Sequence, residues 1–128
     1  MKSFAMTVET TKDIDAAVEA VVEATKQNGF RVLHVHDVAA TLAEKGFDRD
    51  PVRIIEICNA KYASQVLAKD ISLALMLPCP ISVYVQEGKT FISGLLPTSM
   101  VDLYPEAGLE EVAGNVEKVV VQIINQAC

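Results

Sequence analysis

The chain has 128 residues, of which 51% are hydrophobic and 22% charged, so its length and composition suit one domain around one apolar core. Eleven Lys and Arg residues against seventeen Asp and Glu residues give a formal net charge of −6. A surface this acidic repels phosphate backbones and anionic headgroups. We therefore expect neither a nucleic acid nor a membrane as partner.

The sequence carries no recognisable targeting signal, so we expect a cytoplasmic protein. The first apolar run ends at Glu9 and lacks the length and cleavage pattern of a signal peptide. The longest uncharged stretch, residues 71–86, is broken by two prolines and is shorter than the roughly 20 residues of a spanning helix. Three widely spaced cysteines, Cys58, Cys79 and Cys128, suit a reducing compartment better than a disulfide framework.

The N-terminal part of the sequence predicts a strand and then a helix. Residues 3–9 alternate apolar and polar side chains, which predicts a strand with one buried face that includes Phe4. Residues 10–11, both Thr, indicate a helix cap, and residues 12–28 carry apolar positions at helical spacing. Gly29 supplies the left-handed end of that helix.

The middle of the chain predicts two more strands and two short helices. Residues 30–38 have a β-rich composition and precede a short helix over residues 39–45. The β-branched run 52–58 predicts a strand. Asn59 is a good cap for a helix over residues 60–69.

The C-terminal part predicts a hairpin and a long helix. Residues 71–77 are apolar and fit neither a strand nor a helix pattern clearly. Residues 81–86 and 90–96 read as a β-hairpin with Gly88 in its turn. The helix expected over residues 109–126 carries an apolar stripe wider than a single sheet contact requires.

About five strands and three or four helices without strict alternation predict an α+β fold, with a mainly antiparallel sheet packed against the long C-terminal helix and shorter helices. No Gly-rich turn follows the first strand, which disfavours a dinucleotide-binding fold. We find no repeat or linker, so residues 1–128 are expected to form a single domain.

Two short motifs carry a family resemblance. The segment Glu56-Ile57-Cys58-Asn59-Ala60, followed by Leu77-Pro78-Cys79, resembles the bacterial and archaeal family catalogued as domain of unknown function 302. That family typically shows Cys-Asn-Pro, then a helix, then Leu-Leu-Pro-Cys opening a Val-rich hairpin. Gly29-Phe30, Asp37-Val38 and Thr41-Leu42 also match its early segment, so the resemblance covers nearly the whole chain.

The resemblance has two departures and three implications. Ala60 stands where the family usually has Pro, and Pro80 stands where a polar or basic residue is usual. The resemblance implies a TATA-binding-protein-like α+β fold, in which a curved antiparallel sheet grips a long helix, and it implies dimeric members. It implies no established activity, and the name of the fold does not imply DNA binding.

The leading functional hypothesis is a small-ligand cleft near Cys58, Asn59 and Cys79. Cys58 ends a predicted strand just before a helix start, where backbone amides are exposed beside a thiol. Cys79 lies between two prolines that stiffen its backbone. We expect a binding protein rather than an enzyme, because no recognisable catalytic constellation, metal motif or cofactor motif stands out.

Two other classes of function stay open. A thiol-based redox or metal-handling protein would use Cys58 and Cys79, and would need the fold to bring their Cα atoms within about 7 Å. A structural interaction module would leave both thiols inert. His34 and His36 are expected on one strand face about 6–7 Å apart, where a shared metal would need a third ligand, so we interpret them as titrating groups on a half-exposed face.

The assembly prediction is a homodimer. It depends on the wide apolar stripe of the C-terminal helix and on a hydrophobic content beyond what one small sheet needs to cover.

Overall fold

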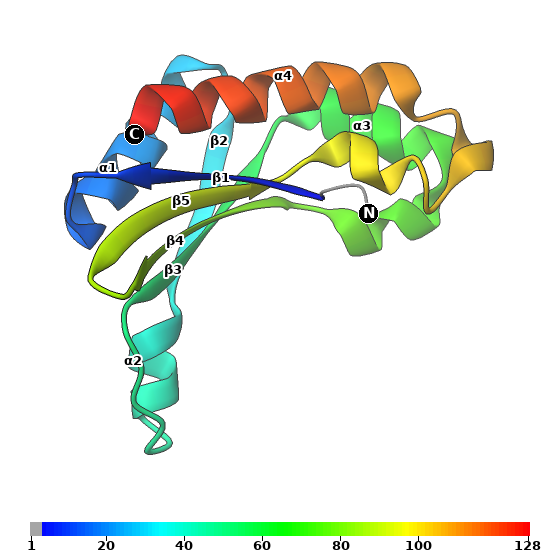
Figure 1. Ribbon diagram of the computed structural model, residues 1–128. Coiled ribbons are helices and arrows are strands. Elements are labelled where there is room, and N and C mark those ends of the chain that lie inside the picture. Colours follow the sequence, from blue (N-terminus) through cyan, green and yellow to red (C-terminus); the bar gives the residue numbers. More distant parts are fainter. Residues whose placement is uncertain (1–3) are drawn as a thin grey trace.

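The computed structural model describes residues 4–128 and shows a curved sheet with helices layered on one face (Figure 1). Three short 3₁₀ helices complete the secondary structure: η1 (Ile71–Met76), η2 (Pro97–Met100) and η3 (Pro105–Ala107). The strands and α-helices are, in chain order, β1 (Ala5–Thr10), α1 (Ile14–Gln27), β2 (Arg31–Asp37), α2 (Val38–Ala43), β3 (Val52–Cys58), α3 (Ala60–Lys69), β4 (Cys79–Gln86), β5 (Lys89–Leu95) and α4 (Glu110–Ala127).

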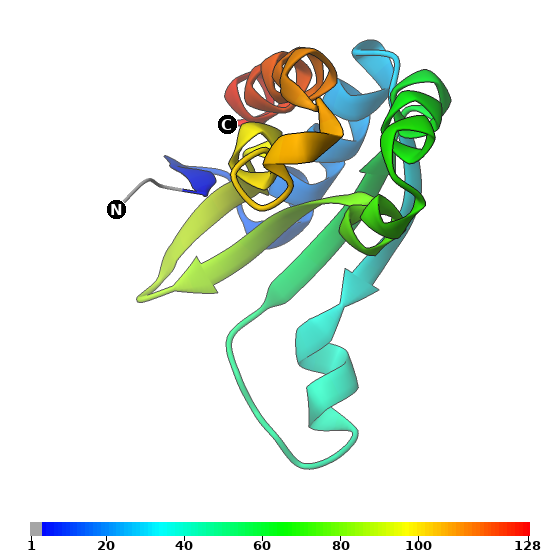
Figure 2. The same ribbon diagram turned by 90° about the vertical axis from the view of Figure 1, so that its right-hand side faces the viewer.

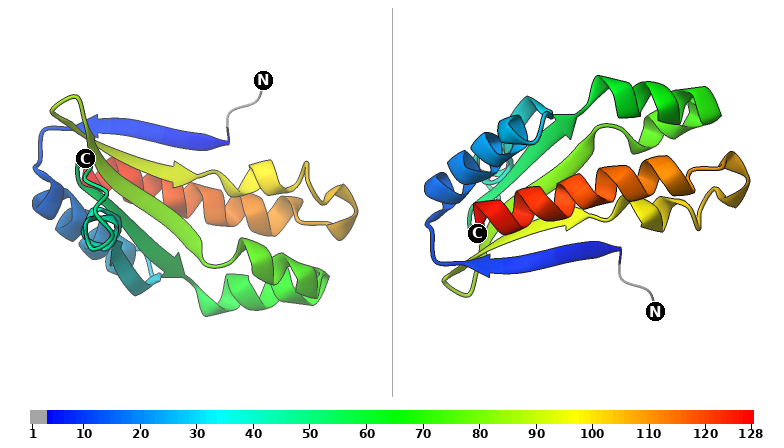
Figure 3. Two further views of the ribbon diagram at one scale, coloured as in Figure 1. Left: turned by 90° about the horizontal axis from the view of Figure 1, so that it is seen from below. Right: turned by 90° about the horizontal axis from the view of Figure 1, so that it is seen from above.

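The five strands form one open sheet in the order β1-β5-β4-β3-β2, and every neighbouring pair is antiparallel. Helices α1, α3 and α4 all lie on the same face of this sheet (Figures 1 and 3). Helix α2 and the loop after it extend away from that layer at the far end of β2 and β3 (Figure 2). This arrangement confirms the predicted α+β class and the mainly antiparallel sheet.

The core lies between the sheet and the helical layer. Strand side chains alternate between the two faces, and one register row on the core side joins Gly94, Ile81 and Ile55. Ile81 and Ile55 are fully buried there. Phe4, expected on the buried face of the first strand, is instead 66% exposed, and the strand begins at Ala5. Residue 3, included in that predicted strand, lies outside the described residues.

Helix α1 begins two residues later than predicted. Its cap is Asp13, whose Oδ1 atom accepts a hydrogen bond from the Ala16 amide at 2.8 Å. The cap expected at residues 10–11 is therefore wrong. Thr10 belongs to β1, and its hydroxyl accepts a hydrogen bond from the Lys12 amide at 3.2 Å. Both threonine and aspartate accept from helix amides, and a carboxylate beside the helix dipole is the stronger competitor.

The hairpin and the turns follow the prediction closely. Gln86 pairs with Lys89, which leaves two residues in the loop. Glu87 and Gly88 have φ values of 53° and 77°, the pair of positive angles that matches the twist of adjacent strands. Gly29, after α1, is also left-handed with a φ of 77°.

The apolar stripe of α4 is buried by contacts within the same chain. Its buried residues pack toward the sheet and toward α1 and α3, and α4 ends beside β1. They are Val112, Ala113, Val116, Val120, Ile123, Ile124 and Ala127. The width of the stripe reflects several partners within the same chain, so it gives no support to the predicted homodimer.

Candidate functional site

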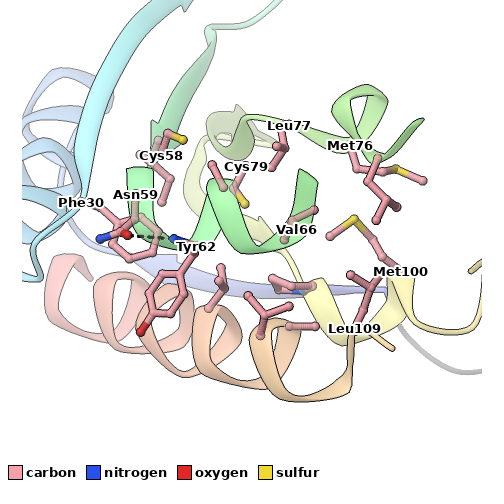
Figure 4. Close-up of a pocket in the computed structure, with 17 residues that line it drawn as sticks. Phe30, Cys58, Asn59, Tyr62, Val66, Met76, Leu77, Cys79, Met100 and Leu109 are labelled. Carbon is pink, nitrogen blue, oxygen red and sulfur yellow. Dashed lines mark hydrogen bonds between the residues drawn. The ribbon is translucent and has the colours of Figure 1, made fainter. Parts of the chain in front are cut away.

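An apolar pocket lies where α3 and α4 meet the ends of β3 and β4 (Figure 4). Helices η1 and η2 close its remaining sides. Its volume is about 40 Å³. The residues that line it are Phe30, Ile57, Cys58, Asn59, Tyr62, Ala63, Val66, Leu73, Met76, Leu77, Cys79, Pro97, Met100, Leu109, Val112, Ala113 and Val116. The structure thus brings Cys58, Asn59 and Cys79 to one pocket wall.

Asn59 shapes this wall through its own hydrogen bonds. Its Oδ1 atom accepts from the Tyr62 amide at 3.2 Å and so caps α3. Its Nδ2 atom donates to the Gly29 carbonyl at 3.1 Å, which ties the start of α3 to the loop before β2. Both ends of the amide are engaged within the protein, so Asn59 positions α3 over the pocket.

The two cysteines lie close along the backbone but point in different directions. Ile57 is the register partner of Cys79. Cys58 is one residue further along β3, which puts its Cα about 6 Å from that of Cys79. Successive side chains on a strand project to opposite faces. In Figure 4 the Cys79 sulfur points toward α4 and the pocket, whereas the Cys58 sulfur points away from them.

This geometry meets the distance condition for a cysteine pair but not the directional one. Disulfide formation requires Cβ vectors that converge as well as close Cα atoms. Both thiols are free, and the backbone at the end of β3 would have to turn before their sulfurs could meet. Burial, and to a lesser degree the neighbouring Cys58, raise the pKa of the Cys79 thiol to about 11. Cys79 is therefore a protonated, weakly reactive group near neutral pH.

The polar groups on the other face of the sheet do not extend the site. The rings of His34 and His36 lie 4.4 Å apart in an edge-on contact, closer than the separation expected from a regular strand. The His36 Nε2 atom lies 3.0 Å from Glu56 Oε1. Across residues 4–128, no group of three His, Cys, Asp or Glu side chains is arranged to hold a metal ion.

Helix η2 is held over the pocket by one carboxylate of α4. Glu117 Oε1 accepts hydrogen bonds from the Thr98 amide at 3.1 Å and from the Thr98 hydroxyl at 2.5 Å. Pro97 and Met100 on either side of Thr98 are both buried pocket residues. These contacts fasten the η2 wall to α4 while leaving the pocket surface apolar.

Most of the apolar wall has no signal in the sequence. Tyr62, Val66, Met100 and Leu109 come from segments that are adjacent only in the folded chain. An apolar position in α3 or α4 indicates burial but not the space it borders. Only the strand-to-helix junction at Cys58 marked the location.

No helix formed by the described residues 4–128 is both long enough and apolar enough to cross a membrane.

The curved open sheet, its one-sided helical layer and the pocket at its end define a small α+β domain. The chain belongs to the family described as domain of unknown function DUF302, whose model matches residues 6–127. Among solved structures, the chain is similar to the crystal structure of an uncharacterized conserved protein DUF302 from Bacillus stearothermophilus. The two share 32% sequence identity with a TM-score of 0.93, over 99% of this chain and 100% of the other. The search of curated proteins finds no match.

Family membership confirms the resemblance carried by Cys58-Asn59 and Leu77-Pro78-Cys79.

Proposed function

We propose that this protein binds a small apolar ligand in the pocket beside Cys58, Asn59 and Cys79. The observation that carries the proposal is a pocket of about 40 Å³ whose wall is almost wholly apolar. An apolar cavity offers water too few hydrogen bonds to hold it. Empty space of this size costs about 1 kcal/mol of stability, which an apolar ligand would recover.

The pocket is too small for most ligands, but two flexible side chains in its wall could enlarge it. Met76 and Met100 line both the pocket and a neighbouring open cleft of about 330 Å³ that also borders Phe4 and Leu103. Methionine side chains have three rotatable bonds and repack easily. Rotation of these two side chains would join the pocket to the cleft. The combined space falls in the size range of ordinary small-molecule sites.

Cys79 contributes a soft, polarisable wall to this site. Its thiol stays protonated near neutral pH and its sulfur points into the pocket. A protonated buried thiol acts as a small hydrophobe. This supports binding over thiol catalysis as the use of the pocket, because the diverging directions of Cys58 and Cys79 disfavour a redox pair.

The test uses N-phenyl-1-naphthylamine, an uncharged dye that fluoresces in apolar sites. We expect saturable binding of one dye per chain. Ala63 lines the pocket, and an Ala63→Leu substitution should weaken dye binding about tenfold by filling the space. Ala68→Leu is the matched control, because Ala68 is exposed on the same helix. Absence of saturable binding, or equal affinity of the two variants, would overturn the proposal.

We also propose that the protein is a homodimer formed through the outer face of the sheet, which is the face opposite α1, α3 and α4. One register row across this face joins Thr7, Ser93, Ser82 and Ile54. Tyr84 and Phe91 stack beside it with ring centroids 5.5 Å apart. The outward residues of the three central strands carry two charges of opposite sign, on Glu56 and Lys89. On a chain of net charge −6, two copies can meet through this face without strong charge repulsion.

Sedimentation at micromolar concentration tests the assembly. We expect a dimer that Ile54→Asp dissociates, since Ile54 lies on the outer face as the register partner of Ser82. Leu75→Asp is the control and should stay dimeric, because Leu75 is 85% exposed on η1, outside the five strands. A wild-type protein that sediments only as a monomer would refute the dimer.

A further inference from the structure

A second, polar cleft lies directly against the apolar pocket. It runs between α3 and α4 and has a volume of about 370 Å³. Tyr62 and Val112 line both spaces, so a single layer of side chains separates them. The other residues of the polar cleft are Lys61, Gln65, Lys69, Gly108, Glu111 and Asn115.

The polar cleft follows from helical spacing on both of its walls. Lys61, Gln65 and Lys69 are four residues apart, so they form one row along α3. Glu111 and Asn115 form the matching row on α4. The apolar side chains of the same helices lie beneath these rows and face the pocket. The chain thus places a polar strip over an apolar space.

The cleft is positive on a protein that is otherwise acidic. Two lysines and one glutamate give it a formal charge of +1, against −6 for the whole chain. Within residues 4–128, neither Lys61 nor Lys69 has a carboxylate oxygen within 4.0 Å of its ammonium group. Lys69 Nζ extends across the cleft to within 3.9 Å of the position that a Cβ at Gly108 would occupy. Both ammonium groups are left to attract an anion.

We propose that the ligand is an amphiphile, with an apolar chain in the pocket and an anionic head group between Lys61 and Lys69. This rests on the proposed function and names the class of ligand. A carboxylate and a phosphate monoester share the required chemistry, since both present acceptor oxygens to lysine. Gln65 and Asn115 supply further amide donors on the two walls. Glu111 opposes the anion, and the two lysines outweigh it.

The test is displacement of N-phenyl-1-naphthylamine from the full chain by decanoate, monodecyl phosphate and decanol. Their tails are alike and only the head groups differ. We expect the better anion to displace the dye at about three- to fivefold lower concentration than decanol at low salt, as for partly exposed charge pairs. Added salt should reduce this preference. The more effective anion identifies the head group.

Two double variants distinguish the effect of the lysines in the cleft from the effect of the overall charge of the chain. Lys61→Gln with Lys69→Gln should abolish the preference for the anions and leave decanol displacement unchanged. Lys45→Gln with Lys118→Gln removes the same charge at exposed positions outside the cleft and should keep the preference. The inference is overturned if decanol matches both anions, or if the two double variants behave alike. Failure of the dye to bind would instead overturn the proposed function itself.

Discussion

Gly94 of β5 lies directly beneath Ile124 of α4. A Cβ atom built on Gly94 would be 2.7 Å from Ile124 Cδ1 and 3.1 Å from Val120 Cγ1, closer than side-chain carbons normally approach. The backbone of Gly94 is not left-handed, so the need for glycine there is one of space. The long C-terminal helix approaches the sheet closely because residue 94 has no side chain.

Gly94→Ala is therefore expected to destabilise the protein by about 1–3 kcal/mol, the usual cost of an overpacked core. The measurement is urea unfolding. Gly114→Ala is the matched control: nothing lies within 4 Å of a Cβ at Gly114, and alanine in a helix interior should add about 0.5–1 kcal/mol. Ile124→Val removes the crowding methyl group and should partly rescue Gly94→Ala. A Gly94→Ala protein as stable as wild type would refute the close-packing argument.

Glu117 gives a second stability prediction, because it joins α4 to η2 through Thr98. Glu117→Ala leaves the Thr98 amide and hydroxyl without their acceptor and should cost about 1–3 kcal/mol. Glu117→Gln should cost less, since its amide oxygen can accept both hydrogen bonds. Urea unfolding gives the energies, and hydrogen exchange at the Thr98 amide should quicken most in Glu117→Ala. Lys118→Ala, exposed beside it on α4, is the control. An unchanged exchange rate at Thr98 would contradict the anchoring role.

Local patterns predicted most of the secondary structure. The strand over 52–58, the Asn59 cap and the helix over 60–69 match the structure residue for residue. These elements have strong local signals, namely β-branched residues, a capping side chain and helical spacing. The N-terminal cap was missed because Thr10, Thr11 and Asp13 all offer suitable acceptors, and only the end of β1 decides among them.

The candidate site could be located but not described from sequence. The motif at Cys58 and Cys79 marks one wall, whereas Val66 and Leu109 of the opposite walls are buried apolar residues like any others. The apolar stripe on α4 predicts that this face of the helix is buried. It does not tell whether the same chain or a second copy covers it. Tertiary contacts alone distinguish an internal contact from an interface.

The raised pKa of Cys79 predicts a pH-dependent stability. The thiol has a pKa of about 11 in the folded protein against an ordinary value of 9.0, so the unfolded chain releases its proton first. The stabilisation is fully present below pH 9 and is lost as the pH rises toward 11. Between pH 8 and 10.5 we expect wild type to lose about 1–3 kcal/mol more than Cys79→Ala in urea unfolding. Parallel pH profiles for the two proteins would contradict a buried, protonated thiol.

The last prediction is the order in which the thiols react, namely Cys128, then Cys58, then Cys79. Cys128 is exposed on α4's last turn, although its carbonyl accepts hydrogen bonds from Thr10 and Lys12, so accessibility rather than fraying makes it first. Cys58 is second because it is only half-buried at the end of β3. Cys79 is last because a pKa of about 11 leaves about one thiolate in ten thousand at pH 7.

Limiting iodoacetamide at pH 7, followed by peptide mass spectrometry, measures this order on the folded protein. Under denaturing conditions the three cysteines should react at similar rates, which is the control for intrinsic peptide effects. A ligand in the pocket should slow Cys79 further, because its sulfur faces that space, and should leave Cys128 unchanged. If Cys79 is labelled before Cys58, the pocket opens to solvent far more often than its packed walls indicate. The binding site would then be an open cleft.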